Sequence, residues 1–174
     1  MKSRLHLPEP EEMTAEQRAV YESVLHTRKN AQGPFLAWLL SPGLADPAQQ
    51  LGSFCRYRST LSVQESELLI LHVAAHYGCV GERQIHEPIA LRAGLSQDVV
   101  FAIRSGEEAP VPTSRLRLLA QCARELLVSK RLNDRLYGEA VAALGEKTLV
   151  EVVGIVGYYA LVAYTLNAFE MRVE

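Results

Sequence analysis

The chain has 174 residues, of which 48% are hydrophobic and 22% charged, and its formal net charge is −2. This length suits one domain with its own core, and the composition is typical of a globular protein. Without a strong positive charge or a basic run, nothing indicates binding to nucleic acid or to an anionic membrane. No apolar stretch follows the charged start Met1–Arg4, so we predict no secretory signal and a cytoplasmic location.

The cysteines Cys55, Cys79 and Cys122 are odd in number and widely spaced. This pattern argues against a disulfide framework and favours a reducing compartment. No two of them have the two-residue gap of a zinc knuckle or a dithiol redox centre. We therefore expect Cys55 and Cys122 to be small buried hydrophobic residues, and the cysteine spacing predicts no metal site.

The first third of the chain predicts helices separated by short breaks. The capping box Thr14–Gln17 starts a helix that ends near Arg28. Pro34 opens a short apolar turn, and Ser41–Gly43 has the composition of another turn. The pair Asp46–Pro47 then reads as the N-cap and first residue of the next helix, where proline is tolerated.

The middle of the chain predicts a helical pair. A capping box at Ser62–Glu65 starts an apolar helix, and Gly78 ends it. A second helix runs from about Cys79 to Ala93, with Pro88 expected to interrupt its hydrogen bonding. Ser96 caps a further helix that reaches about Arg104.

Beyond a loop at 105–113, helices are expected over about 114–129 and 134–144. A capping box at Thr148–Glu151 predicts the start of a last helix, apolar nearly all round, which ends near Phe169. It contains Glu151, glycines, tyrosines and an asparagine, so we expect it in the core or in a subunit interface and not in a membrane. No strand-like alternation appears, and the chain is predicted to be all-α.

The stretch Cys79–His86 carries the clearest candidate chemistry. On a helix, Cys79, Glu82 and His86 share one face because they are three and then four residues apart. Glu82 can then hydrogen-bond the imidazole of His86 and favour its charged form, as a general acid or base needs near neutral pH. The start of the helix is expected to lower the pKa of Cys79. Such Glu–His pairs are also common on solvated helix faces. The spacing alone therefore leaves open that Glu82 and His86 form an ordinary surface pair without a catalytic role.

His72 and His76 repeat the helical spacing one helix earlier. Gly78 separates them from His86, so a shared metal site is disfavoured and both are expected to be ordinary packed or exposed residues.

Several motifs resemble the carboxymuconolactone decarboxylase family, longer-chain subgroup, which shares its fold with the AhpD-type alkylhydroperoxidases. The strongest are Leu61–Ala75, Cys79–Glu82 with His86, and Ala93–Ser96. Weaker similarities lie at Leu40–Ala45, Phe54–Arg58, Gly157–Tyr159 and Leu166–Phe169. The resemblance implies an AhpD-like bundle of about seven to nine helices over a single domain, 1–174. Residues 1–50 would form an N-terminal helical extension and about 51–174 the shared core, and the assembly would be a homo-oligomer, a trimer or hexamer.

The resemblance also divides the possible chemistry. The peroxidase branch uses a Cys-x-x-Cys pair, a nearby histidine and an upstream glutamate. Cys79 matches the first cysteine, but Glu82 stands at the place of the second. This difference argues against a dithiol peroxidase. The decarboxylase branch, which uses neither metal nor organic cofactor, fits the Glu82–His86 pair.

The resulting hypothesis is a cofactor-free, decarboxylase-like enzyme for a small carboxylated or lactone-type substrate. His86, oriented by Glu82, would transfer the proton. Arg56 or Arg58 would hold a carboxylate, since a guanidinium pairs with it through two hydrogen bonds; the alternative for each is a surface or interface position. Tyr158, with Tyr159 beside it, is the further candidate for substrate binding, and core packing is the alternative for both.

Two alternatives remain open from the sequence. One is a peroxidase or reductase that uses Cys79 alone, with Cys79 as a catalytic residue. The other is a non-catalytic member that binds a small ligand or a partner.

Overall fold

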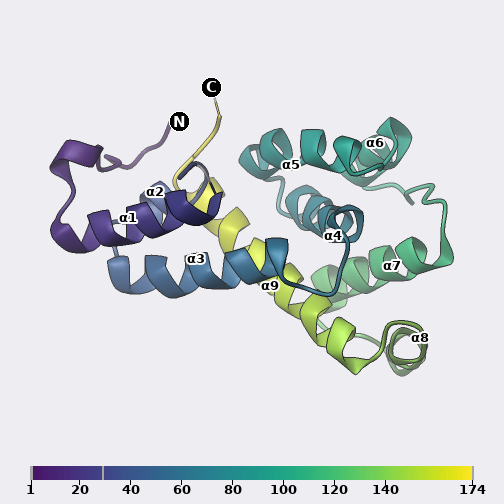
Figure 1. The fold of residues 1–174 in the computed structure, drawn as a ribbon. Helices are drawn as coiled ribbons and strands as arrows, with labels where there is room; N and C mark the ends of the chain where they lie inside the picture. The colour runs from purple at the N-terminus through teal and green to yellow at the C-terminus, as the bar shows by residue number, and fades with distance from the viewer. Residues whose placement is uncertain (1, 29, 174) are drawn as a thin grey trace.

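The computed structural model describes residues 2–28 and 30–173, and these residues form helices joined by turns (Figure 1). Within that range the only β pairing is an isolated bridge between Lys2 and Arg172, which brings the two ends of the chain together. The elements are η1 Pro10–Glu12, α1 Ala15–Arg28, α2 Phe35–Trp38, α3 Pro42–Tyr57, α4 Val63–His76, α5 Val80–Arg92, α6 Gln97–Ser105, α7 Ser114–Ser129, α8 Asp134–Leu144 and α9 Glu146–Ala168. The prediction of an all-α protein is confirmed, with nine α-helices among the described residues.

Helices α4 and α9 form the centre of the bundle. Helix α4 packs against α5, α6, α7 and α9, and α9 also contacts α3, α5, α7 and α8. Figure 1 shows α1 and α3 side by side on one flank and α5 to α7 on the other, with α9 running between the two groups. The site described below lies where the α1–α3 flank meets α5 across α9.

Helix α4 is the most deeply buried element. Its start follows the predicted capping box, in which Ser62 and Glu65 bond each other's backbone N–H groups. The chain leaves the helix through Gly78 at φ +57, a conformation that glycine adopts without steric cost. All residues from 66 to 74 are buried. Two of them, Glu67 and His72, are titratable, so their surroundings have to satisfy polar groups inside the core.

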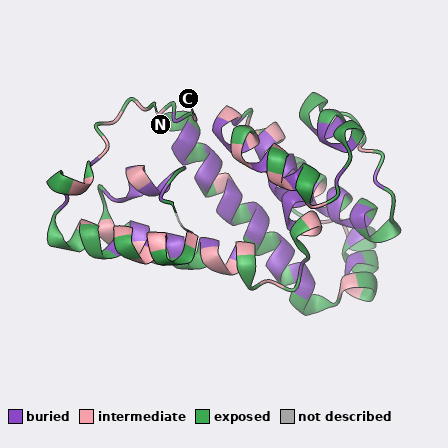
Figure 2. Cartoon of the chain, turned by 45° about the horizontal axis from the view of Figure 1, so that its top comes forward, coloured by how far each residue is buried: buried purple, intermediate pink, exposed green. Residues whose placement is uncertain are grey.

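Helix α9 combines a buried side with an exposed apolar side. Its buried residues include Val152, Ile155 and Val162, and Figure 2 shows buried positions recurring along its whole length. By length and composition α9 is able to cross a membrane, but 61% of its most apolar window is buried inside the protein. The core helix of a globular protein meets the same criterion, and the contacts of α9 are those of such a helix.

Two predicted helix starts were wrong. Helix α3 begins at Pro42, four residues before the expected N-cap Asp46, and Pro47 lies inside it. Asp46 instead accepts hydrogen bonds from the side-chain amides of Gln49 and Gln50. Pro42 has the fixed φ that suits a first helical residue, and the residues after it pack against α1, which explains the earlier start.

Helix α9 likewise begins at Glu146, so Thr148 and Glu151 do not form the predicted capping box. A carboxylate oxygen of Glu151 accepts hydrogen bonds of 2.6 Å from the backbone N–H and the hydroxyl of Thr60. A contact far away in the sequence therefore replaces the local one. It ties the α3–α4 connection to the first turns of α9.

The remaining caps and the structural cysteines agree with the sequence. Thr14 and Gln17 make both bonds of their capping box, and Ser96 accepts from the backbone N–H of Val99. Helix α5 continues through Pro88, so the proline does not divide the helix. Cys55 and Cys122 are free and buried, as predicted.

Candidate active site

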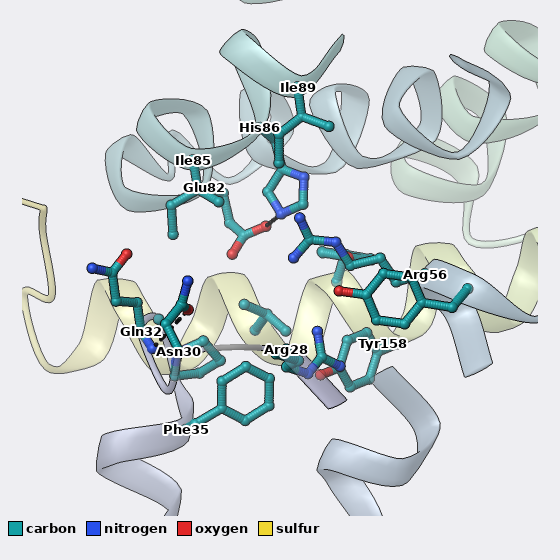
Figure 3. Close-up of a pocket in the computed structure, with 15 residues that line it drawn as sticks. Arg28, Asn30, Gln32, Phe35, Arg56, Glu82, Ile85, His86, Ile89 and Tyr158 are labelled. Atoms are coloured by element: carbon teal, nitrogen blue, oxygen red, sulfur yellow. Dashed lines mark hydrogen bonds and ion pairs between the residues drawn. The ribbon is translucent and has the colours of Figure 1, made fainter. Parts of the chain in front are cut away.

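A cavity of about 190 Å³ opens between the segment that follows α1 and the helices α3, α5 and α9 (Figure 3). Polar side chains from three regions of the chain meet an otherwise aromatic and aliphatic wall. The lining residues are Arg28, Asn30, Gln32, Gly33, Pro34, Phe35, Arg56, Tyr57, Glu82, Ile85, His86, Ile89, Tyr158, Tyr159 and Val162. Of the predicted site residues, Glu82, His86, Arg56 and Tyr158 lie here together.

Three titratable side chains form a buried row that ends at the cavity. The Nδ1 atom of His86 lies 2.7 Å from Oε2 of Glu67, which projects from α4. The Nε2 atom of His86 lies 3.4 Å from Oε2 of Glu82, one turn earlier on α5. All three residues are at most 3% exposed. With Glu67 ionised, Nδ1–H of His86 donates to it, and Nε2 is left facing Glu82.

Glu82 is electrostatically unusual. Burial raises its pKa above the ordinary range, and the neighbouring charge of Glu67 adds to this, whereas His86 and Arg56 oppose it. Its Oε2 atom is buried and finds no hydrogen-bond partner of good geometry among the described residues. A carboxyl with a raised pKa keeps its proton closer to neutral pH, so the Glu82–His86 pair is suited to proton transfer.

Aromatic side chains of α9 pack against the row formed by Glu67, His86 and Glu82. The rings of His86 and Tyr159 meet edge to face with centroids 5.3 Å apart, and Tyr158 packs against Tyr159 in the same way at 5.2 Å. The hydroxyl of Tyr158 lies so close to Gly52 of α3 that a Cβ atom there would sit 2.1 Å away. Burial raises the pKa of Tyr158 above its usual value, so its hydroxyl stays protonated at neutral pH. Gly52 is therefore required for the position of Tyr158.

The two predicted carboxylate-binding arginines are separated by the structure. Arg56 lines the cavity, and in Figure 3 its guanidinium points toward Glu82 and His86. Its Cζ atom also lies 5.8 Å from the ring centroid of Tyr57. Arg58 is exposed at the C-cap of α3 and does not line the cavity. The structure therefore brings Arg56 to the cavity and does not bring Arg58 there.

Cys79 differs from its prediction. It is the N-cap of α5, is fully buried and does not line the cavity. Burial raises the pKa of its thiol to about 11, and this outweighs the hydrogen bonds from the backbone of Glu82 and Gly81 at the helix start. The expected lowering of the Cys79 pKa was wrong, since removal from water has the larger effect here.

Two residues of the candidate site were not predicted from the sequence. Glu67 is a charged residue at the start of the apolar run 68–71 of α4, and that position was the available signal. Arg28 belongs to the segment interpreted as an N-terminal extension, and nothing in its local pattern points to the site. Its Cζ atom lies 4.6 Å from the ring centroid of Phe35, which holds the guanidinium at the cavity.

The earlier histidines take no part in the row. His72 faces α6 and α7, and its Nδ1 atom lies 2.7 Å from the carbonyl oxygen of Leu68 within the same helix. His76 is exposed. In the part of the chain that the structure describes, no group of three or more His, Cys, Asp or Glu side chains converges as a metal site.

Comparisons with known proteins define the fold. No family model matches the sequence, and no curated protein matches it. A peroxidase-related protein with an alkylhydroperoxidase AhpD core, from Ralstonia eutropha JMP134, superposes with a TM-score of 0.82 at 16% identity, over 99% of this chain and 92% of that chain. A peroxidase-related protein from Silicibacter sp. TM1040 gives 0.79 at 14% identity, over 97% and 90%. The debrominase Bmp8 in complex with 2,3,4-tribromopyrrole gives 0.76 at 14%, over 98% and 91%.

The predicted AhpD-like bundle is therefore confirmed as the fold of this chain. Identities of 14–16% carry the fold and not the chemistry, and the similar structures include proteins described as peroxidase-related and as a debrominase. The division near residue 50 into an extension and a shared core stays a prediction.

Proposed function

We propose that this chain is a decarboxylase-like enzyme that transfers a proton to or from a small carboxylated or lactone-type molecule, with no cofactor. The observation that carries the proposal is the buried row Glu67–His86–Glu82, which ends at a cavity. A histidine held by one carboxylate and facing a second, proton-retaining one is an arrangement suited to general acid–base catalysis. The cavity also contains Arg56, a cation suited to holding a carboxylate.

The reaction can be written with its electrons accounted for. The C–C bond to a substrate carboxylate breaks, CO₂ leaves, and a conjugated lactone carbonyl accepts the electron pair to form a dienolate. The Glu82–His86 pair then delivers one proton to carbon, and solvent restores it. Glu67 fixes the orientation of the imidazole and stabilises its charged form while the proton moves.

A peroxidase that uses a single cysteine is disfavoured by the place of Cys79. A thiol needs its thiolate form and access to peroxide to react. Cys79 is fully buried, does not line the cavity, and has a pKa of about 11. The non-catalytic alternative keeps the cavity as a ligand site and assigns the buried row a structural role.

The assembly stays a proposal as well. Helix α9 exposes apolar side chains along one side, among them Val150, Val153 and Tyr164. A trimer or hexamer that covers this side would suit such a surface. Light scattering on the purified protein measures the mass directly, and a monomer at micromolar concentration would contradict the proposal.

The experiment that tests the function is an ultraviolet assay with 4-carboxymuconolactone on wild type, His86→Ala and Cys79→Ser. Decarboxylation that falls by ~10²–10⁴ in His86→Ala and persists in Cys79→Ser supports the proposal. Loss in Cys79→Ser alone would assign the chemistry to the thiol. An inactive wild type that still binds the lactone would favour the non-catalytic alternative and remove the decarboxylase assignment.

A further inference from the structure

A second cavity, of about 380 Å³, lies among α4, α6 and α7 and shares no lining residue with the candidate active site. Helix α4 packs against both of the other helices (Figure 1). The volume is within the range of about 300–1,000 Å³ that small-molecule sites occupy. Part of its wall is aliphatic, formed by Ala75, Ile103, Leu127 and Val128. This part suits a short aliphatic group, and the rest of the wall is polar.

His72 brings an unused hydrogen-bond acceptor to this cavity. The residue is 6% exposed, and its Nδ1 atom lies 2.7 Å from the carbonyl oxygen of Leu68. A carbonyl oxygen only accepts, so Nδ1 carries the hydrogen and Nε2, at the outer end of the neutral ring, keeps its lone pair. Nε2 makes no hydrogen bond within the described residues. A ligand that donates an N–H or O–H would satisfy this buried acceptor.

Two side chains of opposite charge line the same cavity. Arg124 projects from α7, and Glu107 lies in the turn that ends α6. Neither takes part in an ion pair among the described residues, whereas Arg104, which also lines the cavity, pairs with Glu87 at 3.8 Å. The backbone N–H of Glu107 donates to the carbonyl oxygen of Ala102 at 2.9 Å, which fixes the start of the loop. The cavity therefore offers one cation and one anion that have no partner of their own.

The end of α6 adds partial negative charge beside Glu107. The last carbonyl groups of a helix have no partners within it and form the negative end of its dipole. Ser105 and Gly106, at this end, line the cavity. Helix α6 and its turn thus supply negative charge, α7 supplies positive charge, and α4, which contacts both, supplies the acceptor of His72.

A metal ion fits this cavity less well than a ligand with charges of its own. His72 and His76 are four residues apart on α4, a spacing that also occurs in metal sites. Burial lowers the pKa of both rings, and the positive charges of Arg124 and Lys130 add to this at His72 and His76 respectively. The same charges oppose a divalent cation. Within the part of the chain that the structure describes, no third His, Cys, Asp or Glu converges on the pair.

We propose that this second cavity binds a small aliphatic α-amino acid. Arg124 donates to the carboxylate of the ligand, since a guanidinium pairs with a carboxylate through two hydrogen bonds. Glu107 pairs with the ammonium group, and Nε2 of His72 accepts one of its N–H bonds. The aliphatic side chain packs against Ile103 and Leu127. The site is separate from the proposed catalytic cavity, and binding there needs no turnover.

Isothermal titration calorimetry with L-leucine and two matched analogues tests the proposal. 4-Methylpentanoate keeps the side chain and the carboxylate but has no ammonium group. 3-Methylbutylamine keeps the side chain and the ammonium group but has no carboxylate. The proteins are wild type, Arg124→Gln, Glu107→Gln and His72→Leu, and circular dichroism melting curves establish that each variant folds.

The chain offers a matched control for each charged residue. Arg117 lies seven residues before Arg124 on α7, is exposed and does not line the cavity. Glu108 follows Glu107, is exposed and also lies outside the cavity. The controls are Arg117→Gln and Glu108→Gln. A third, Arg56→Gln, removes the arginine of the candidate active site and so reports on binding in that cavity.

Wild type is expected to bind one leucine per chain, at least ~10-fold more tightly than either analogue. Arg124→Gln should weaken leucine binding by at least ~10-fold, because the carboxylate loses its partner. Glu107→Gln and His72→Leu should each weaken it by ~3–10-fold, as the loss of one hydrogen bond predicts. The three control variants should bind leucine as wild type does.

The proposal is wrong if wild type shows no saturable leucine binding, or if either analogue binds as tightly as leucine. Equal affinities in Arg124→Gln and Arg117→Gln would also contradict it. A loss of binding in Arg56→Gln, with Arg124→Gln unchanged, would place the ligand in the other cavity and overturn the assignment.

Discussion

Helix α4 buries one titratable side chain on each of two sides, and each lies near a cavity. The two differ in their hydrogen-bond partners. Glu67 reaches across to His86 on α5, and the contacts continue to Glu82 and the cavity. His72 turns the other way and bonds the carbonyl oxygen of Leu68 in its own helix. Burial lowers the pKa of His72, and the positive charge of Arg124 adds to this, so the ring stays neutral.

The comparison separates a histidine held by its own helix from a catalytic candidate. A polar side chain that bonds its own backbone needs no partner on another helix to hold it, and its helix would remain intact without it. The Glu67–His86–Glu82 row spans two helices, contains a buried oxygen with no hydrogen bond among the described residues, and opens to a cavity. Burial alone therefore does not indicate catalysis, whereas a buried row of titratable groups with unused bonding capacity beside a cavity does.

The largest expected difference is in stability. His86→Leu leaves the buried carboxylate of Glu67 without its partner and should cost about 3–5 kcal/mol of unfolding free energy. His72→Leu removes a neutral ring of similar size and should cost about 1 kcal/mol or less. Urea denaturation of both variants measures the difference, and equal losses would contradict the comparison.

The next largest expected effect on stability comes from a substitution at Gly52, which lies against the hydroxyl of Tyr158. Gly52→Ala would put a Cβ atom 2.1 Å from the hydroxyl of Tyr158, so that ring has to move, at a cost of about 1–3 kcal/mol. Gly138 is the control, because it lies inside α8 with nothing within 4 Å of an added Cβ. Gly138→Ala should stabilise the protein by about 0.5–1 kcal/mol. Thermal melting of the two variants checks whether the signs are opposite.

The pH dependence of the unfolding free energy tests whether the pKa of Glu82 is raised in the folded protein. A carboxyl whose pKa is higher in the folded than in the unfolded chain holds its proton more tightly in the folded state. Its contribution is complete below about pH 4.3, the unfolded value, and is lost as the pH rises through the raised folded value. Wild type should therefore lose stability relative to Glu82→Gln as the pH increases over this window. A difference between the two that stays constant with pH would show that the Glu82 pKa is not raised.

The smallest expected effect concerns the thiols. The three cysteines are buried, and burial raises the pKa of each to about 11, so few thiolates exist at neutral pH. Native protein should resist alkylation by iodoacetamide at pH 7.5 and react only after unfolding. Mass spectrometry counts the modified cysteines. Rapid labelling of Cys79 in the native state would reopen the thiol hypothesis.

The sequence predicted what depends on neighbours along the chain. Capping signals located the starts of α4 and α6, and the four-residue spacing of Glu82 and His86 placed both on one face of α5. It did not predict the partner of His86, because Glu67 lies nineteen residues earlier on another helix. Such a contact depends on how α4 packs against α5, which a spacing rule does not contain.

The same limit explains why the sequence did not distinguish Arg56 from Arg58, did not point to Arg28, and gave the wrong direction for the pKa of the nearby cysteine. Arg56 and Arg58 are indistinguishable by residue type, and only the last turn of α3 decides which one faces the cavity. Arg28 reaches the site from α1 through packing on Phe35. The helix start near Cys79 was visible in the sequence, but its degree of burial was not, and burial determines the direction of the pKa shift.

In the proposed reaction His86 transfers the proton and His72 does not. The most direct test is the rate of 4-carboxymuconolactone decarboxylation in wild type, His86→Leu and His72→Leu, measured side by side on folded protein. The rate should fall by ~10²–10⁴ in His86→Leu and stay near that of wild type in His72→Leu. Equal rates in the two variants would contradict proton transfer by His86.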